Sequence, residues 1–259
     1  MSYSFPVEPG TKVNLAKIDL AADGGLSKSN GVQRTAKLLG KVADLQQELY
    51  AASVHSVLVV LQGMDTSGKD GTIRHVLSGA NPQDCQVTSF KAPNDVELDH
   101  DYLWRIHRRT PAKGMIGVFN RSHYEDVLIV RVHDLLPRKI WKQRYKQIND
   151  FERPLVDSGT IVCKFFLHIS KHEQEQRLHA REQDVEKAYK LSPDDRKERD
   201  HWDDYVAAYE EALWRCSTPE APWTIVPADR KWYRNLAIAE ALVGRLEVVA
   251  GPGRRACGR

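Results

Sequence analysis

Residues 56–71 read SVLVVLQGMDTSGKDG, and this segment indicates the class of fold. Its first half is an unbroken apolar run rich in β-branched residues, which is the pattern of a parallel strand buried on both faces. Its second half places Gly63, Gly68 and Lys69 at the spacing of a phosphate-binding loop. In such a loop backbone N–H groups surround one phosphate, the lysine reaches the next, and the following helix contributes its dipole. A purely structural glycine-rich turn is the alternative, and the helical apolar pattern after the loop argues against it.

The same alternation of strand and helix patterns continues along the chain. Long amphipathic helices are predicted from Val32 to about Ala52 and from about Arg138 to Val156. Further strands are predicted at residues 86–90, 115–119, 160–169 and 223–226. Strands that are separated by helical segments predict an α/β fold, here a five-stranded parallel sheet flanked by helices.

The chain divides into three predicted parts. Residues 1–31 contain several Gly, Pro and Ser residues and few apolar clusters, so we expect an irregular N-terminal arm. Residues 32–250 are expected to form a single domain that buries its own core. Within this domain, residues 177–200 lead into a charged segment interrupted by proline, which indicates a helical and loop lid at the surface. The tail, residues 251–259, is predicted to be disordered.

Composition limits the classes of function. Among 259 residues, 38 are Lys or Arg and 35 are Asp or Glu, and a net charge of +3 gives no support for nucleic-acid binding. No apolar stretch is long enough to cross a bilayer and no signal peptide is visible, so a cytoplasmic protein without a membrane partner is predicted. The 4 cysteines are scattered and form no C-x-x-C pair, which argues against a zinc site or a disulfide framework.

Two carboxylates accompany the phosphate-binding loop. Asp70 stands where such loops usually carry Ser or Thr as a magnesium ligand, and Asp65 lies inside the loop. Because carboxylates repel a phosphate chain unless a divalent cation lies between them, we expect Mg²⁺ at Asp65 and Asp70, with Mn²⁺ as an alternative. Asp70 would also suit the first turn of a helix, where it would only complement the dipole.

A second polar cluster follows the strand predicted at residues 115–119. Arg121 comes directly after it, at the end of the strand where open α/β sheets place their ligands. A guanidinium there suits the charge that spreads over a transferring phosphoryl group. Glu125 is a candidate to accept a hydrogen bond from a ribose or base, or to complete the metal shell. The same cluster would also serve as an ordinary capping turn.

Further arginines lie near the predicted lid. Arg177 and Arg181 are four residues apart on a predicted helix, so they are candidates to close over phosphates and exclude water. Such a pair is also common on a solvated helix face, and Arg199 carries the same ambiguity. Two basic clusters, at residues 105–113 and 138–146, would extend a positive track for a long polyanion.

Six motifs, taken in order, carry a resemblance to a known family. They are GMDTSGKDG at 63–71, SFKAP at 89–93, DYLWRIH at 101–107, FNRSHYE at 119–125, ERDHW at 198–202 and APW at 221–223. With these motifs the chain resembles a family-2 polyphosphate kinase over nearly its whole length. It is most like the subgroup that acts on both nucleoside mono- and diphosphates. The resemblance implies a P-loop kinase fold similar to that of thymidylate kinase.

The resemblance also implies an activity and the residues that carry it. Such enzymes move a phosphoryl group reversibly between inorganic polyphosphate and nucleotides with Mg²⁺, so AMP, ADP, GMP, GDP and ATP are the expected nucleotides, and a homotetramer is the expected assembly. Catalysis is expected of Asp65, Lys69, Arg121 and Glu125, and metal binding of Asp65 and Asp70. Phosphate binding is expected of Thr66, Ser67, Gly68, Lys69, Asp70, Gly71, Arg121, Arg177, Arg181 and Arg199. Nucleotide binding is expected of Lys91, Asn120 and Glu125.

Two other functions remain open. An ATP-dependent nucleoside monophosphate kinase would share the fold and the loop, although Asn120 stands where such kinases usually carry Asp, and the additional basic clusters favour a polymer. A non-catalytic module would use the same loop as an anion sensor and bind polyphosphate without turnover.

Overall fold

The structure is a computed structural model that describes residues 3–183 and 197–250. The predicted disordered tail at 251–259 and most of the predicted lid, residues 184–196, lie outside the described residues. Within the described part, no helix is both long enough and apolar enough to span a bilayer.

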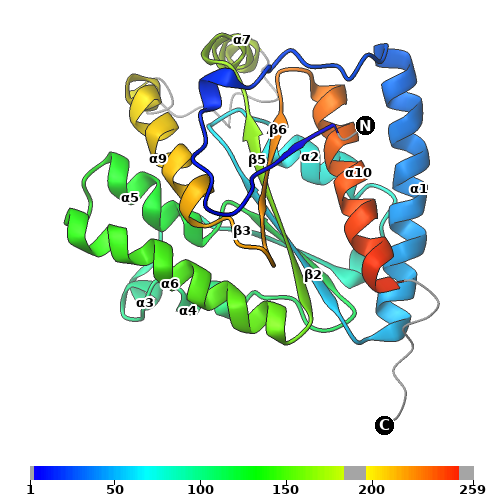
Figure 1. Cartoon of the computed structure of the whole chain (residues 1–259), viewed down its shortest axis with the longest axis horizontal. Helices are drawn as coiled ribbons and strands as arrows, with labels where there is room; N and C mark the ends of the chain where they lie inside the picture. Colours follow the sequence, from blue (N-terminus) through cyan, green and yellow to red (C-terminus); the bar gives the residue numbers. More distant parts are fainter. Residues whose placement is uncertain (1–2, 184–196, 251–259) are drawn as a thin grey trace.

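A mixed sheet of six strands lies at the centre of the molecule (Figure 1). The strands are β1 (Phe5–Pro6), β2 (Ser56–Gln62), β3 (Cys85–Ser89), β4 (Ile116–Asn120), β5 (Thr160–His168) and β6 (Trp223–Pro227), in the spatial order β1-β6-β5-β2-β4-β3. All neighbouring pairs from β3 to β6 are parallel, whereas β1 is antiparallel to β6. The prediction of a purely parallel, five-stranded sheet is therefore wrong, although each of the five predicted strands is present.

The sixth strand comes from the N-terminal segment, which was expected to be irregular. Phe5 of β1 lies opposite Ile225 of β6, and the next residue, Val7, donates its N–H to the Trp223 carbonyl at 2.8 Å. A short 3-10 helix, η1 (Leu15–Lys17), follows, and the first long helix already begins at Lys28. A strand of two residues is too short to produce an alternating pattern, so the sequence carries no periodic signal for it.

Helices cover both faces of the sheet (Figure 1). One face carries α1 (Lys28–Ala52), α2 (Lys69–Val76) and α10 (Lys231–Ala250), and α1 packs along α10. The other face carries α5 (Ile129–Val132), α6 (Arg138–Asp157) and α9 (Trp202–Arg215). The shorter elements are η2 (Pro82–Asp84), α3 (Asp95–Leu98), α4 (Trp104–His107), η3 (His123–Val127) and η5 (Arg199–His201). The helix α7 (Lys171–Glu182) follows β5.

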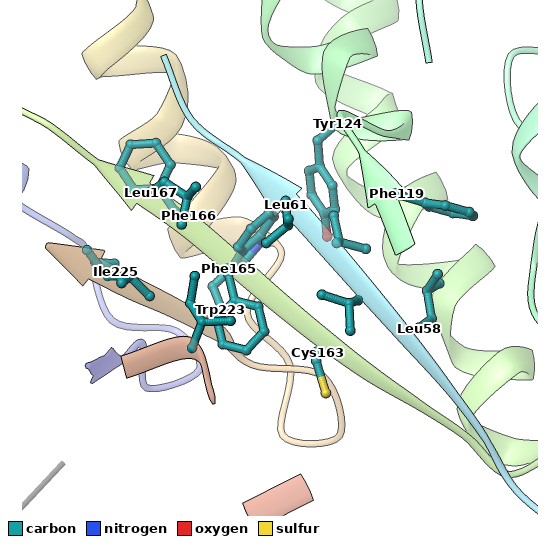
Figure 2. Packing of buried hydrophobic residues seen from close by; sticks show 14 of the residues in the cluster. Leu58, Leu61, Phe119, Tyr124, Cys163, Phe165, Phe166, Leu167, Trp223 and Ile225 are labelled. Carbon is teal, nitrogen blue, oxygen red and sulfur yellow. The ribbon is translucent and has the colours of Figure 1, made fainter. Parts of the chain in front are cut away.

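The core is formed by the central strands and the helices on either side. Every residue of β2 is buried, as the unbroken apolar run predicts for a central parallel strand. Leu58, Phe119, Phe166 and Trp223 come from four different strands and pack in this core (Figure 2). Burying large apolar side chains on both faces of the sheet supplies most of the favourable free energy of folding.

The topology brings two loops together at one edge of the sheet. β2 lies between β4 and β5, with Leu61 opposite both Asn120 and Phe165. Because these strands are parallel, their carboxyl ends meet, and the loops after β2 and β4 become neighbours. This is the edge where open α/β sheets place their ligands.

Candidate active site

The loop after β2 has the backbone geometry that its glycines and one threonine impose. Gly63, Thr66 and Gly68 all have positive φ angles, of 156°, 62° and 99°. A Cβ atom on Gly63 would lie 2.6 Å from the Leu167 carbonyl oxygen, so only glycine fits there. Gly68 is the N-cap of α2, which places the N-terminus of that helix at the end of the loop. The predicted sequence of strand, loop and helix is therefore present.

Lys69 is buried and folds back over the loop. Its ammonium donates to the carbonyl oxygens of Gly63 at 2.7 Å and Met64 at 3.3 Å. Burial lowers the pKa of Lys69, while the charges of Asp65, Glu125 and Asp70 act in the opposite direction. The amine therefore lies at the centre of the loop among three carboxylates.

Three hydroxyl groups on or beside the loop have no hydrogen-bond partner among the described residues. The buried Oγ1 atoms of Thr66 and Thr72 and the Oγ atom of Ser67 make no hydrogen bond within the described residues. Buried hydroxyls of this kind are normally satisfied, so an acceptor such as a phosphate oxygen would remove an energetic cost here.

Arg121 leaves the end of β4 and reaches across to the loop after β2. Its backbone has φ of 63°, an uncommon conformation for a residue other than glycine, and its N–H donates to the Leu61 carbonyl at 3.2 Å. Its Nη2 donates to Asp65 Oδ1 at 2.8 Å. Burial alone would lower the pKa of Arg121, but Glu125 and Asp65 outweigh it and raise the pKa. The guanidinium is thus held, fully charged, beside the loop.

Glu125 lies behind Arg121 in η3. Burial raises its pKa, and the charges of Arg121 and Lys69 oppose that rise. Gln62, the last residue of β2, is completely buried, and with its amide oriented to satisfy both neighbours it donates to Glu125 Oε1 at 3.0 Å and accepts from Ser122. The two strand ends are therefore joined by side chains as well as by the sheet.

Asp70 and Asn120 form a second link between the loops. Asn120 Nδ2 donates to Asp70 Oδ1 at 2.7 Å. Asp70 also lies in the first turn of α2, so the structure is consistent with both interpretations of this residue, metal ligand and dipole partner.

A cavity of about 170 Å³, open to solvent, lies over these loops. The loops contribute Gly63, Met64, Asp65, Arg121 and Glu125 to its lining. The rest of the lining includes three aromatic side chains and consists of Ile129, Gln174, Glu198, Trp202, Tyr205 and Tyr209. The cavity therefore offers both charged groups for a phosphate and aromatic surface.

Comparison with known proteins identifies the family of the chain. The sequence profile of polyphosphate kinase 2 (PPK2) matches residues 25–251. The chain belongs to the polyphosphate kinase 2 family. It is 47% identical, over 95% of this chain and 93% of the relative, to an AMP/ADP-polyphosphate phosphotransferase of Meiothermus ruber. It is 46% identical, over 94% and 89%, to an ADP-polyphosphate phosphotransferase of Rhodopseudomonas palustris.

A solved structure of the same family extends the likeness to the fold. Polyphosphate kinase 2 from Arthrobacter aurescens TC1 is 41% identical to the chain and superposes with a TM-score of 0.91, over 97% of this chain and 90% of that one. At this identity the likeness covers the sheet, the helices and the loops that carry the site.

Four of the residues expected at the site of a PPK2 enzyme lie away from the cavity. Arg177 lies behind the loop, and its guanidinium is committed to Glu173 and to backbone carbonyls. Arg199 contacts Glu175 at 3.6 Å and lines a separate charged cavity. Lys91 is exposed, and its carbonyl accepts from Arg105 at 2.8 Å. Arg181 is half-buried at the end of α7, and its side chain forms no ion pair with another described residue.

Sequence reasoning missed the residues that support the loops from outside. Gln62 and Gln174 contact the site through hydrogen bonds that depend on the tertiary fold, and neither belongs to a recognisable motif. Trp202 belongs to one of the six motifs, but no role at the site was predicted for its aromatic ring. Tyr205 and Tyr209 follow on the same face of α9, and that i, i+3, i+7 spacing was the available signal.

The carboxylates of the site suit magnesium better than any softer metal. Within the described residues no three His, Cys, Asp or Glu side chains come together as a metal cage. Mg²⁺ usually takes only one or two protein carboxylates and completes its shell with water and substrate phosphates. Asp65 lines the cavity and Asp70 lies at the start of α2, so this region offers two carboxylates of the kind that Mg²⁺ takes from a protein.

Proposed function

We propose that this chain transfers a phosphoryl group reversibly between inorganic polyphosphate and AMP or ADP. The observation that carries the proposal is that Arg121 and the loop after β2, whose carbonyls Lys69 contacts, meet at one cavity, because this arrangement matches the charge of a phosphate chain. The names of the two relatives from Meiothermus ruber and Rhodopseudomonas palustris support the same substrates. The core is proposed to be a P-loop kinase fold similar to thymidylate kinase, with a lid near residues 177–200.

The chemistry follows from the charges at the site. A terminal phosphate oxygen of the nucleotide attacks the terminal phosphorus of polyphosphate in line, and the bond to the next phosphate breaks, which releases a polymer shortened by one unit. The attacking oxygen is already ionised, so no strong general base is needed. Arg121 stabilises the charge on the transferring group, Lys69 and the loop N–H groups hold the phosphates, and Glu125 contacts the nucleotide. Bound at Asp65 and Asp70, Mg²⁺ would neutralise charge between the carboxylates and the phosphates.

The deciding experiment offers purified protein AMP, Mg²⁺ and polyphosphate without ATP. Formation of ADP and then ATP is the expected result, and Lys69→Ala is the matched variant that should lose both. Absence of any nucleotide product would contradict the proposal. Adding EDTA tests the metal requirement, and replacing Mg²⁺ by Mn²⁺ tests the alternative ion. GMP and GDP as acceptors test the base, and ATP with short polyphosphate tests the reverse direction.

The two alternatives predict different results in the same assay. A nucleoside monophosphate kinase would make ADP from AMP and ATP without polyphosphate. An anion-binding module would bind polyphosphate with no turnover. The homotetramer and the cytoplasmic location stay predictions, and light scattering of the pure protein tests the first of them.

A further inference from the structure

The carbonyl groups of the phosphate-binding loop receive hydrogen bonds from outside it. A loop whose N–H groups face a phosphate turns its carbonyls away from the ligand, and each buried carbonyl then needs a donor. Lys69 donates to the carbonyls of Gly63 and Met64, and Gln174 Nε2 donates to the Asp65 carbonyl at 3.2 Å. The carbonyls of Thr66 and Ser67 accept from two buried arginines, Arg177 of α7 and Arg234 of α10.

Arg177 uses all of its N–H groups in this position. Nη1 donates to the carbonyls of Thr66 at 2.9 Å and Ser67 at 3.0 Å. Nη2 donates to the carbonyls of Ala228 at 2.6 Å and Asp229 at 3.0 Å, just after β6, and Nε donates to Glu173 at 2.7 Å. A guanidinium has five donors in a fixed plane, so this residue clamps the loop to β6 while its charge is balanced by Glu173.

Arg234 lies next to Arg177 but, within the described residues, is not balanced by an acid. Its side chain is only 3% exposed, and Nη1 donates to the Ser67 carbonyl at 3.2 Å. Its other donors reach the side-chain oxygen of Asn235, and within the described residues it takes part in no ion pair. Burial, and then the charge of Arg177, lower the pKa of Arg234 to about 10. It remains a cation at neutral pH.

Two glycines of the loop region pack directly against this guanidinium. A Cβ atom on Gly68 would lie 1.9 Å from Arg234 Nη1, and one on Gly71 would lie 3.7 Å from Nη2. Gly68 therefore has to be glycine for two reasons, its positive φ and its contact with the arginine. The charge consequently lies immediately behind the residues that begin α2.

A buried cation without a counter-ion is unfavourable in a protein unless something neutralises it. The ligand expected on the other side of the loop is a chain of negative phosphates. The free energy that the protein loses by burying Arg234 would then be regained when the phosphate chain binds, because the two charges interact through a thin, poorly solvated loop.

We propose that Arg234 is a positioning residue of the phosphate site, which holds the Ser67 carbonyl and supplies from behind the loop a positive charge that the bound phosphate chain neutralises. The inference rests on the proposed function, since it requires the loop to bind a phosphate chain. Arg177 donates to the same Ser67 carbonyl, but the charge of Arg177 is already neutralised by Glu173.

Three variants separate the charge from the hydrogen bond. Arg234→Met removes both, Arg234→Gln keeps an N–H donor without charge, and Arg234→Lys keeps the charge without the planar fork. The matched control is Arg230→Met, which removes a cation one turn earlier, where Arg230 pairs with Asp23 at 2.7 Å on the surface. Each protein is heated with and without inorganic tripolyphosphate in Mg²⁺ at constant ionic strength, and the KM for polyphosphate is measured.

We expect tripolyphosphate to raise the Tm of the wild type and of Arg230→Met equally. In Arg234→Met and Arg234→Gln the increase should be less than half as large, with a KM for polyphosphate raised about tenfold. Arg234→Lys should lie between them and the wild type. A merely structural arginine would lower the Tm of the free protein and leave both the Tm increase and the KM unchanged.

The outcomes also separate this inference from the proposed function. If the wild type shows neither a Tm increase nor phosphoryl transfer, the proposed function fails. If the wild type shows both and the Arg234→Gln and Arg234→Lys proteins match Arg230→Met in Tm increase and KM, only the inference is overturned. These two variants keep the test decisive if Arg234→Met does not fold.

Discussion

The loops after β2 and β4 are neighbours, yet the protein supports them in opposite ways. The loop after β2 is held by Arg177 and Arg234, and the second of these adds a charge that no acid in the described residues balances. The loop after β4 continues into η3, whose Tyr124 hydroxyl donates to the buried Glu152 at 2.8 Å. Lys164 of β5 donates to the same carboxylate at 2.6 Å, so there the charges cancel within the protein.

The difference reflects what each loop has to do. The loop after β2 is proposed to hold a polyanion, so part of its stabilisation is completed only by the ligand. The loop after β4 contributes side chains, chiefly Arg121 and Glu125, and these must be positioned before substrate arrives. Tyr124, which anchors that loop, lies among the core residues of the central strands (Figure 2). Substitutions at the cavity should therefore affect rates, and substitutions in the buried network should affect stability.

The largest effect is expected from Arg121→Ala. The rate constant kcat should fall by at least about 10³-fold, or about 4 kcal/mol, because among the described residues that line the cavity only Arg121 offers a planar cation to the transferring group. Stability should change by less than about 1 kcal/mol, since Arg121 and Asp65 are 41% and 35% exposed and exposed pairs contribute little. Steady-state kinetics and urea unfolding of the same protein give both values.

The control for Arg121→Ala is Arg34→Ala, which breaks the exposed pair of Arg34 in α1 with Glu240 in α10. It should leave kcat unchanged. A variant Arg121→Ala that keeps kcat within tenfold of the wild type would remove Arg121 from the proposed chemistry.

The next largest effect is expected from Lys164→Met. Glu152 and Lys164 are both almost completely buried, and Lys164 also donates to the Cys216 carbonyl at 2.6 Å. Removing the lysine leaves a buried carboxylate without its cation, and the free energy of unfolding should fall by about 3–5 kcal/mol. Equilibrium unfolding in urea measures it.

A double variant sharpens this test. In Lys164→Met with Glu152→Gln the buried charge is gone and the amide oxygen still accepts from Tyr124, so part of the lost stability should return. If the double variant is as unstable as the single one, lost packing rather than the unpaired charge explains the effect.

A smaller effect is expected from pH, through His123. This imidazole contacts Glu152 at 3.2 Å, and burial lowers its pKa below the ordinary value of 6.5. The unfolded chain therefore binds a proton that the folded protein does not. The contribution of His123 to the free energy of unfolding is complete above the pKa of the unfolded chain, and it is lost as the pH falls below that pKa. When the pH is lowered from about 7.5 to about 5.5, the free energy of unfolding of the wild type should fall by about 1 kcal/mol more than that of His123→Gln.

This difference is measured by urea unfolding of both proteins at the two pH values. Burial raises the pKa of Asp126 to about 6, which acts in the opposite direction because the folded state then binds the proton. Asp126 is present in both proteins, so its contribution cancels from the difference. Equal losses in the two proteins would show that folding does not lower the pKa of His123.

Much of the architecture around the site was predictable because it rests on local patterns. The buried strand β2, the glycine spacing and the helix α2 follow each other within residues 56–76, and each has a signature of its own. The parallel order then requires Arg121 to lie near that loop. The pair of Arg121 with Asp65 follows from topology, although its distance could not be foreseen.

The supports behind the loops were not predictable, for a physical reason. Arg234 and Lys164 are charged residues that the fold buries, and charged residues in a sequence normally indicate surface. Arg177 was predicted to close over the phosphates because it lies four residues before Arg181 on a helix that leads into the predicted lid. Only the packing of α7 and α10 against the loop reveals what these guanidiniums contact.

The smallest effect concerns backbone strain and compares two residues with the left-handed conformation. Ser53, after α1, has φ of 50°, and Thr66, in the loop, has φ of 62°. Replacing either residue by glycine relieves strain, so the free energy of unfolding measured in urea should rise by about 0.5–1 kcal/mol in each variant.

The two variants should differ in activity. Ser53 is exposed and remote from the cavity, so Ser53→Gly should keep full activity. Thr66→Gly should lose activity several-fold, because glycine lets the loop leave the conformation that Arg177 and Arg234 hold. A Thr66→Gly protein that is both more stable and fully active would mean that the arginines alone position the loop, and that the strain at Thr66 contributes nothing to binding.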